Sequence, residues 1–163
     1  MRLIIMGQQA FGKECLEALL SKGKDEVAAV YCAPDKENKP LDPIKEYALE
    51  QELPVVQPRN FKDKKVLDEM RSFNADLCVM AYVTLFVPEA AREIPTQGSI
   101  CFHPSLLPKH RGPSSINWAI ISGATKTGLT IFWPSDGLDE GDILLQKEVD
   151  VDKDDTLGIV YFQ

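Results

Sequence analysis

Short apolar runs alternate with amphipathic stretches along most of the chain. Residues 3–6, 27–32 and 75–82 are apolar at nearly every position, which is typical of parallel strands that are covered on both faces. Residues 13–23 carry apolar side chains at helical spacing and end in a glycine, as an amphipathic helix does. This alternation predicts an α/β fold with a doubly wound, mostly parallel sheet.

Further segments continue the same alternation. Asp42 and Pro43 are typical of the N-cap and the first position of a helix. We predict helices over residues 41–52, 63–73, 88–93 and 113–122, and strands over residues 54–58, 98–103, 128–133 and 142–149. The turn at residues 7–12 lacks the middle glycine of the dinucleotide-binding motif and the Lys-Ser/Thr of a P-loop, so we expect a tight strand-to-helix turn.

The composition is that of a soluble domain. Apolar residues make up 44% of the 163 residues and charged residues 26%, enough to bury a core. The net charge of -7 argues against a nucleic-acid surface, which needs clustered lysine and arginine, and favours a small polar ligand. The N-terminal apolar run is too short for a secretory signal, and no run approaches membrane-spanning length. We therefore expect a cytoplasmic protein with no membrane partner.

The cysteines give no sign of a disulfide framework. Cys15, Cys32, Cys78 and Cys101 are scattered, without a Cys-x-x-Cys pair. Three of them lie in apolar strand-like runs, where cysteine behaves as a small hydrophobe. Free thiols are expected, and no zinc site.

Both histidines of the chain lie between residues 101 and 112. His103 ends a predicted strand, which places it at the sheet edge where ligands bind in such folds. A second polar loop, residues 135–142, follows a later strand and holds four acids among glycines. These acids are Asp136, Asp139, Glu140 and Asp142. A carboxylate beside an imidazole is a common acid/base pair, although a loop histidine and an ordinary Asp/Gly turn also fit this pattern.

Three short sequence motifs in this region resemble those of the formyltransferase fold family. They are HPSLLPKHRG at residues 103–112, INW at 116–118 and DGLDEGD at 136–142. The resemblance extends over residues 1–163, and members of this family use 10-formyltetrahydrofolate as one-carbon donor. It implies a Rossmann-like formyltransferase catalytic domain with this folate as co-substrate and no required metal. It also implies that His103 is the catalytic histidine and that Asp139 is its essential partner.

The resemblance further implies a folate-binding surface. Leu85, Phe86 and Val87 are expected at the pterin end, although the apolar character of these residues suits a packed core equally well. The other implied contacts are Ser105, Leu106, Leu107 and Pro108 in one loop and Asp136, Gly137 and Leu138 in the other. His110 is by default part of a solvated basic loop with Lys109 and Arg111, and the alternative is that these two cations steer an anionic folate tail.

Cys101 marks a departure from the transferase members of the family. Those members carry an asparagine two residues before the catalytic histidine, and its amide helps to hold the formyl oxygen as it becomes an oxyanion. A thiol is a weak donor, so this contribution is expected to be much smaller here. Within the family, the sequence is most similar to the N-terminal hydrolase domain of 10-formyltetrahydrofolate dehydrogenase, which also lacks the asparagine. A nucleophilic role for Cys101 is the less favoured interpretation, because His103 is the only nearby residue in the sequence that could activate it as a thiolate.

The favoured function is removal of the formyl group of 10-formyltetrahydrofolate to water or its transfer to an amine, with His103 and Asp139 as the acid/base pair. One alternative is the catalytic domain of a methionyl-tRNA formyltransferase, a more distant relative. Another is a non-catalytic folate-binding remnant or regulatory domain, to which Cys101 and the early end of the chain point. Residues 1–163 are expected to form the N-terminal catalytic domain, cut before its remainder and any C-terminal domain. The acceptor and the oligomeric state stay open.

Overall fold

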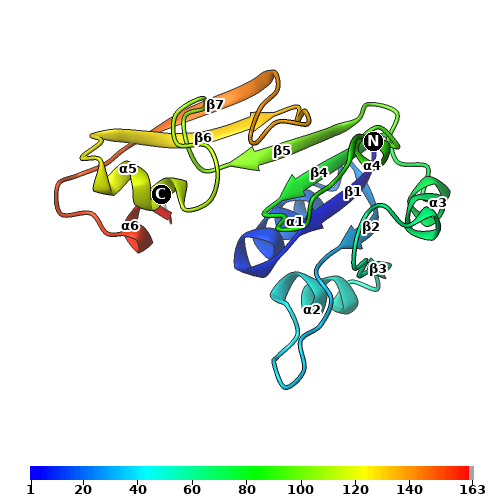
Figure 1. Cartoon of the computed structure of the whole chain (residues 1–163). Helices are drawn as coiled ribbons and strands as arrows, with labels where there is room; N and C mark the ends of the chain where they lie inside the picture. The colour runs from blue at the N-terminus through cyan, green and yellow to red at the C-terminus, as the bar shows by residue number, and fades with distance from the viewer. Residues whose placement is uncertain (162–163) are drawn as a thin grey trace. The chain divides into compact units, whose positions relative to one another are not determined.

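The structure is a computed structural model that describes residues 1–161. Its strands follow the order β3-β2-β1-β4-β5-β6-β7 in a seven-stranded sheet, and Figure 1 traces them along the chain. The strands are β1 (Arg2–Gly7), β2 (Glu26–Tyr31), β3 (Val55–Val56), β4 (Leu77–Ala81), β5 (Ser99–His103), β6 (Lys126–Phe132) and β7 (Ile143–Asp150). The helices are α1 (Gln9–Lys22), α2 (Pro43–Glu50), α3 (Lys64–Ser72), α4 (Glu89–Arg92), α5 (Ser115–Ile121) and α6 (Leu157–Tyr161). No helix within these residues is long and apolar enough to cross a membrane.

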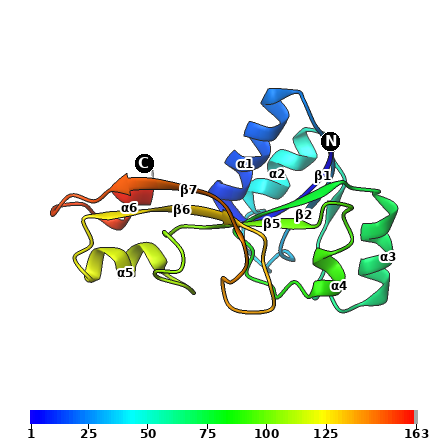
Figure 2. The ribbon, with the colours of Figure 1, turned by 90° about the horizontal axis from the view of Figure 1, so that it is seen from above.

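Residues 1–100 form the first of two compact units. The strands β1, β2, β3 and β4 pair in parallel, as expected where helices connect successive strands. Figure 2 shows α1 and α2 on one side of β1 and β2, and α3 and α4 on the other. This part of the molecule confirms the predicted doubly wound arrangement.

The core of the first unit lies between its strands and the pair α1 and α2. Leu16 of α1, Ile5 of β1, Val30 of β2 and Ile44 of α2 are completely buried in one cluster. Burying such side chains contributes roughly 1.5–3 kcal/mol each. The apolar positions that predicted the helices and strands are therefore those that form the core.

The turn between β1 and α1 is tight, as predicted, but α1 begins at Gln9 rather than at residue 13. The backbone N–H of Gln9 donates to Asp42 Oδ1 at 2.8 Å, so a side chain from α2's N-cap holds the first residue of α1. A Cβ on Gly7 would lie 2.8 Å from the carbonyl oxygen of Ala81, which explains the glycine there. The sequence pattern missed the first turn of helix α1 because Gln8 and Gln9 are polar and do not extend the apolar periodicity that predicted the helix.

Residues 101–163 form the second unit, described here to residue 161. In it β5 pairs with β6 and β6 with β7, both antiparallel. β7 runs antiparallel to β6 because the loop that joins them is too short for a crossover helix. The connection from β5 to β6 contains α5, so its length does not account for their antiparallel pairing. The helix predicted over residues 113–122 is α5, and it begins at Ser115 because Ser114 adopts a left-handed conformation with φ of 61°.

Candidate active site

His103 and Asp139 meet in the second unit. His103 is the last residue of β5, where it pairs with Thr130 of β6, and it is only 6% exposed. Asp139 lies in the loop between β6 and β7, and its Oδ2 is 3.4 Å from Nδ1 of His103. Folding thus brings together the two residues that the family resemblance assigned to acid/base chemistry.

Both members of this pair also contact the backbone of the loop after β5. Nε2 of His103 is 2.8 Å from the carbonyl oxygen of His110, and the N–H of Gly112 donates to Asp139 Oδ2 at 2.6 Å. A carbonyl oxygen can only accept, so Nε2 carries a hydrogen. The other ring nitrogen, Nδ1, faces the carboxylate of Asp139, and a proton between these two groups can be transferred to or from a reacting molecule.

The loop at residues 105–108 is anchored to the interior of the second unit. Ser105 is completely buried, and its hydroxyl donates to the carbonyl of Lys109 at 2.7 Å. The Thr130 hydroxyl donates to Ser105 O at 2.7 Å, and the N–H of Leu107 lies 3.1 Å from the same hydroxyl oxygen. Of the four residues expected to bind folate here, Ser105 and Leu107 are buried, Leu106 is half-buried and Pro108 is exposed.

The backbone of the acidic loop folds back on itself, and Asp139 is the acid of this loop whose carboxylate lies beside His103. Gly141 has a φ of 131°, and a Cβ on it would lie 1.8 Å from the carbonyl oxygen of Trp133. Glu140 forms an ion pair with Arg111 at 2.9 Å. Asp136, Gly137 and Leu138, the expected folate contacts, are exposed, and Leu138 is 67% accessible. Within residues 1–161 no group of three or more histidine, cysteine, aspartate or glutamate side chains is placed to hold a metal ion.

Cys101 lies two residues before His103 on β5, opposite Phe132 of β6. Residues two apart on a strand share a face. Burial, and secondarily the charge of Asp139, raises the pKa of the Cys101 thiol to about 12. The thiol therefore stays protonated near neutral pH, which argues against a nucleophilic role because the thiolate is the reactive form.

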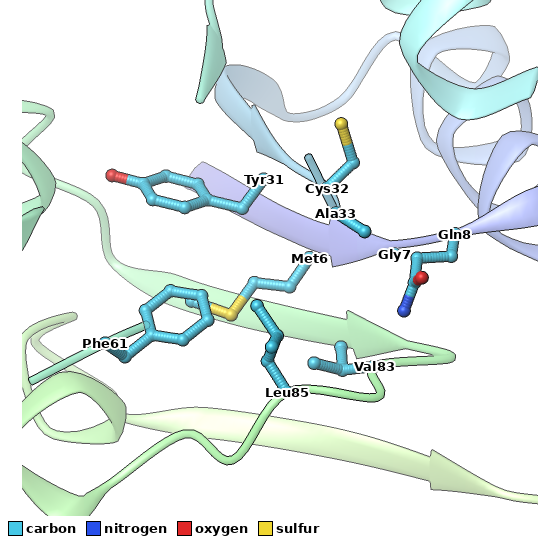
Figure 3. Close-up of a pocket in the computed structure, with 9 residues that line it drawn as sticks. All are labelled: Met6, Gly7, Gln8, Tyr31, Cys32, Ala33, Phe61, Val83 and Leu85. Carbon is cyan, nitrogen blue, oxygen red and sulfur yellow. The ribbon is translucent and has the colours of Figure 1, made fainter. Parts of the chain in front are cut away.

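The three residues expected to bind the pterin lie in the first unit and differ in exposure. Phe86 is 63% exposed, whereas Val87 is 5% exposed and belongs to the core. Leu85 lines a small pocket at the carboxyl ends of β1 and β2. Figure 3 shows this pocket, with the side chains of Met6, Phe61 and Leu85 lying toward one another. Its free space of about 20 Å³ is room for roughly one water molecule.

Several residues of this pocket escaped the sequence interpretation. The full lining is Met6, Gly7, Gln8, Tyr31, Cys32, Ala33, Phe61, Val83 and Leu85. The Tyr31 hydroxyl is buried and has no hydrogen-bond partner among the described residues, and burial raises its pKa. The sequence feature that could have identified these residues is their place at the ends of strands. Tyr31 ends β2 and Val83 follows β4, at the sheet edge where α/β folds bind ligands.

A larger hollow of about 240 Å³ lies beside the turn between β1 and α1, among residues 33–43. Two acids there are engaged within the protein: Asp35 pairs with Lys45, and Asp42 accepts from the N–H groups of Gln9 and Ile44. Lys36 and Lys39 also line the hollow and are exposed. The hollow is thus lined by two lysines and two aspartates, whose formal charges balance.

Comparisons with known proteins agree with the motifs. The model of the formyl transferase family matches residues 1–162. Cytosolic 10-formyltetrahydrofolate dehydrogenase of Mus musculus is 41% identical over 166 residues, which cover 99% of this chain and 18% of the relative. Methionyl-tRNA formyltransferase of Alkaliphilus oremlandii is 39% identical over 163 residues, which cover 97% of this chain and 52% of the relative. The chain thus spans about a fifth of the dehydrogenase and about half of the transferase. Another relative, from Mus musculus, is a mitochondrial dehydrogenase with 42% identity, so these likenesses do not select a cellular compartment.

Solved structures show the same fold. Phosphoribosylglycinamide formyltransferase from Bacillus halodurans superimposes with a TM-score of 0.85 at 25% identity, covering 99% of this chain and 86% of that one. A formyltetrahydrofolate deformylase from Pseudomonas syringae has a TM-score of 0.79 at 23% identity, covering 99% and 55% of the two chains. Together with the family match over nearly all its residues, this places the chain in the formyl transferase family.

Proposed function

We propose that this chain removes the formyl group of 10-formyltetrahydrofolate and delivers it to water or to an amine. The observation that carries the proposal is the buried His103, whose Nδ1 faces the Asp139 carboxylate while Nε2 is bound to a carbonyl. A histidine held in one tautomer beside a carboxylate is suited to acid/base chemistry. Membership of the formyl transferase family, and relatives named for 10-formyltetrahydrofolate, support the choice of substrate.

The proposed reaction is an acyl transfer. The oxygen of water, or an amine nitrogen, forms a bond to the formyl carbon, and the carbonyl oxygen becomes an oxyanion. The His103–Asp139 pair takes the proton that the nucleophile loses and delivers a proton to the folate nitrogen as its bond to carbon breaks. Formate, or a formylated amine, and tetrahydrofolate are the products, so atoms and charge balance without an oxidant or reductant.

The proposed folate contacts are those with accessible surface. In the first unit Phe86 offers an exposed aromatic face, whereas Val87 is buried and offers no surface to a ligand. In the second unit Leu138 is exposed on the acidic loop, next to Asp136 and Gly137. The buried Ser105 and Leu107 are proposed to shape the site through their loop rather than by side-chain contact.

Water is the acceptor that the Cys101 position favours. An oxyanion forms with either acceptor, and an oxyanion-hole donor contributes roughly 3 kcal/mol in such sites. The transferases that the sequence resembles supply this donor from the asparagine that Cys101 replaces, whereas the hydrolase domain that it resembles lacks the asparagine. A protonated thiol donates weakly, so less of that stabilisation is available here. The same feature is the reason to retain one alternative, a folate-binding domain without turnover.

Release of tetrahydrofolate in the absence of any acceptor tests the proposal. We expect the purified chain to release tetrahydrofolate and formate in equal amounts, followed by absorbance and by a formate assay. Folate binding without release, even when small primary amines are added, would favour the non-catalytic alternative. Absence of binding would contradict both.

Restoring an amide donor at position 101 should favour transfer. In Cys101→Asn the amide N–H is expected to stabilise the oxyanion and raise formyl transfer to a small amine by about tenfold. The matched control is Cys101→Ala, which removes the same thiol and adds no donor. An equal gain in both variants would show that loss of the thiol, not a new hydrogen bond, is responsible.

A further inference from the structure

We propose that residues 110–112 position the acid/base pair, with the His110 carbonyl holding His103 and the Gly112 amide holding Asp139. The catalytic consequence rests on the proposed function, whereas the positioning itself does not. The segment was expected to be a solvated basic loop. Its backbone, rather than its cationic side chains, is what reaches the site.

The two backbone groups contact the pair from opposite ends. The carbonyl oxygen of His110 lies 2.8 Å from His103 Nε2, and the N–H of Gly112 lies 2.6 Å from Asp139 Oδ2. That Oδ2 is also the atom 3.4 Å from His103 Nδ1. One short segment therefore fixes the orientation of the ring and of the carboxylate that faces it.

The conformation of the segment is unusual and explains how both groups reach the pair. His110 has a φ of 53° and Gly112 a φ of 81°. Left-handed backbone is uncommon for a residue other than glycine, although asparagine, aspartate and histidine adopt it more often than other residues do. Asp139 itself has a φ of 46°. Unfavourable backbone conformations of this kind cluster at functional sites, where surrounding contacts maintain them.

Neighbouring contacts hold the segment in this conformation. The buried Ser105 hydroxyl donates to the carbonyl of Lys109, the residue before His110. Arg111 pairs with Glu140, the residue after Asp139, at 2.9 Å. Three consecutive residues are thus connected to β5 and to the acidic loop. The pairs are His110–His103, Arg111–Glu140 and Gly112–Asp139.

The hydrogen bond to His110 determines which ring nitrogen exchanges protons. Nε2 keeps its hydrogen because its partner is a carbonyl, which cannot accept the proton itself. Nδ1, on the side of Asp139, is then the atom that gains and loses the proton during the reaction. His110 acts through its backbone carbonyl, so this positioning role does not require its imidazole.

The proposal predicts the tautomer of His103 independently of activity. Nitrogen-15 spectra of the full chain labelled at histidine should show neutral His103 with its hydrogen on Nε2. With only two histidines in the chain, the His110→Asn variant removes the other signal and assigns the spectrum. The opposite tautomer at His103 in the unmodified chain would overturn the proposal, even if every variant failed to fold. The expected tautomer in a chain that releases no tetrahydrofolate would uphold the positioning and reject the proposed function.

Substitutions at position 110 test the backbone conformation. Valine disfavours a positive φ and asparagine tolerates it, and neither keeps the imidazole. We expect kcat of His110→Asn to exceed that of His110→Val by at least tenfold, with KM for the folate similar in both. His110→Val should also show a mixture of His103 tautomers. Equal kcat values and identical His103 spectra in the two variants would contradict the assignment.

Discussion

His103→Gln lowers the rate of tetrahydrofolate release by a factor on the order of 10³, within the range that general acid–base catalysis contributes. Glutamine is chosen because its amide can still donate to the His110 carbonyl, which the imidazole contacts at 2.8 Å. It has no group that titrates, so it can neither take the proton of the nucleophile nor deliver one to the departing nitrogen. The loss is expected in kcat, with folate affinity nearly unchanged.

The measurement is single-turnover release of tetrahydrofolate, with folate binding measured separately by calorimetry. Thermal unfolding of His103→Gln should match that of the unmodified chain within a few degrees, since the buried polar contact is preserved. Release at the unmodified rate would show that another group moves the proton. A large loss of folate binding with unchanged kcat would instead make His103 a binding residue.

The first unit was predictable because β1, β2 and β4 are buried along most of their length, on both faces. Ile5 and Val30 lie in apolar runs whose burial leaves little choice of partner, and parallel pairing follows from the helices between those runs. The apolar pattern of β6 and β7 did not indicate that these strands pair in the antiparallel direction. Leu144 and Leu145 of β7 are apolar yet more than half exposed, so their pattern resembles a buried strand although the strand lies at the edge of the sheet.

The site was predictable only in part, because periodicity carries no information about backbone contacts over long sequence separations. His103 and Asp139 were identified from their motif, and the structure brings them together. The role of His110 was missed, since nothing in a Lys-His-Arg sequence indicates a positive φ at the histidine. The Tyr31 pocket was missed for a related reason: its lining comes from the ends of separate strands, each of which resembles ordinary core.

Asp139→Asn should reduce kcat by a factor on the order of 10² to 10³, while the loop keeps its conformation. Asparagine has nearly the shape of aspartate and tolerates a positive φ, so the φ of 46° at this position is not a difficulty. Its amide oxygen can still accept from the Gly112 N–H, which reaches Asp139 Oδ2 at 2.6 Å. What is lost is the negative charge beside Nδ1, which stabilises the imidazolium when His103 takes the proton.

The matched control is Asp142→Asn in the same loop. It makes the same change of net charge on an exposed residue whose backbone carbonyl, rather than its side chain, accepts from Trp133. A loss confined to Asp139→Asn assigns the effect to the position of the carboxylate. Equal losses in the two variants would mean that the overall negative charge of the loop, and not a partner for His103, is what the reaction requires.

Combining the two site substitutions decides whether His103 and Asp139 act as one unit. Residues that share a proton are strongly non-additive, because once the histidine is gone its partner has nothing left to stabilise. The double variant His103→Gln/Asp139→Asn should therefore be no slower than His103→Gln alone, within about threefold. If the losses of rate in the two single variants multiply in the double variant, Asp139 must contact the substrate directly. The 3.4 Å between Asp139 Oδ2 and His103 Nδ1 would then mean that the two residues lie in the same site without acting on the same proton.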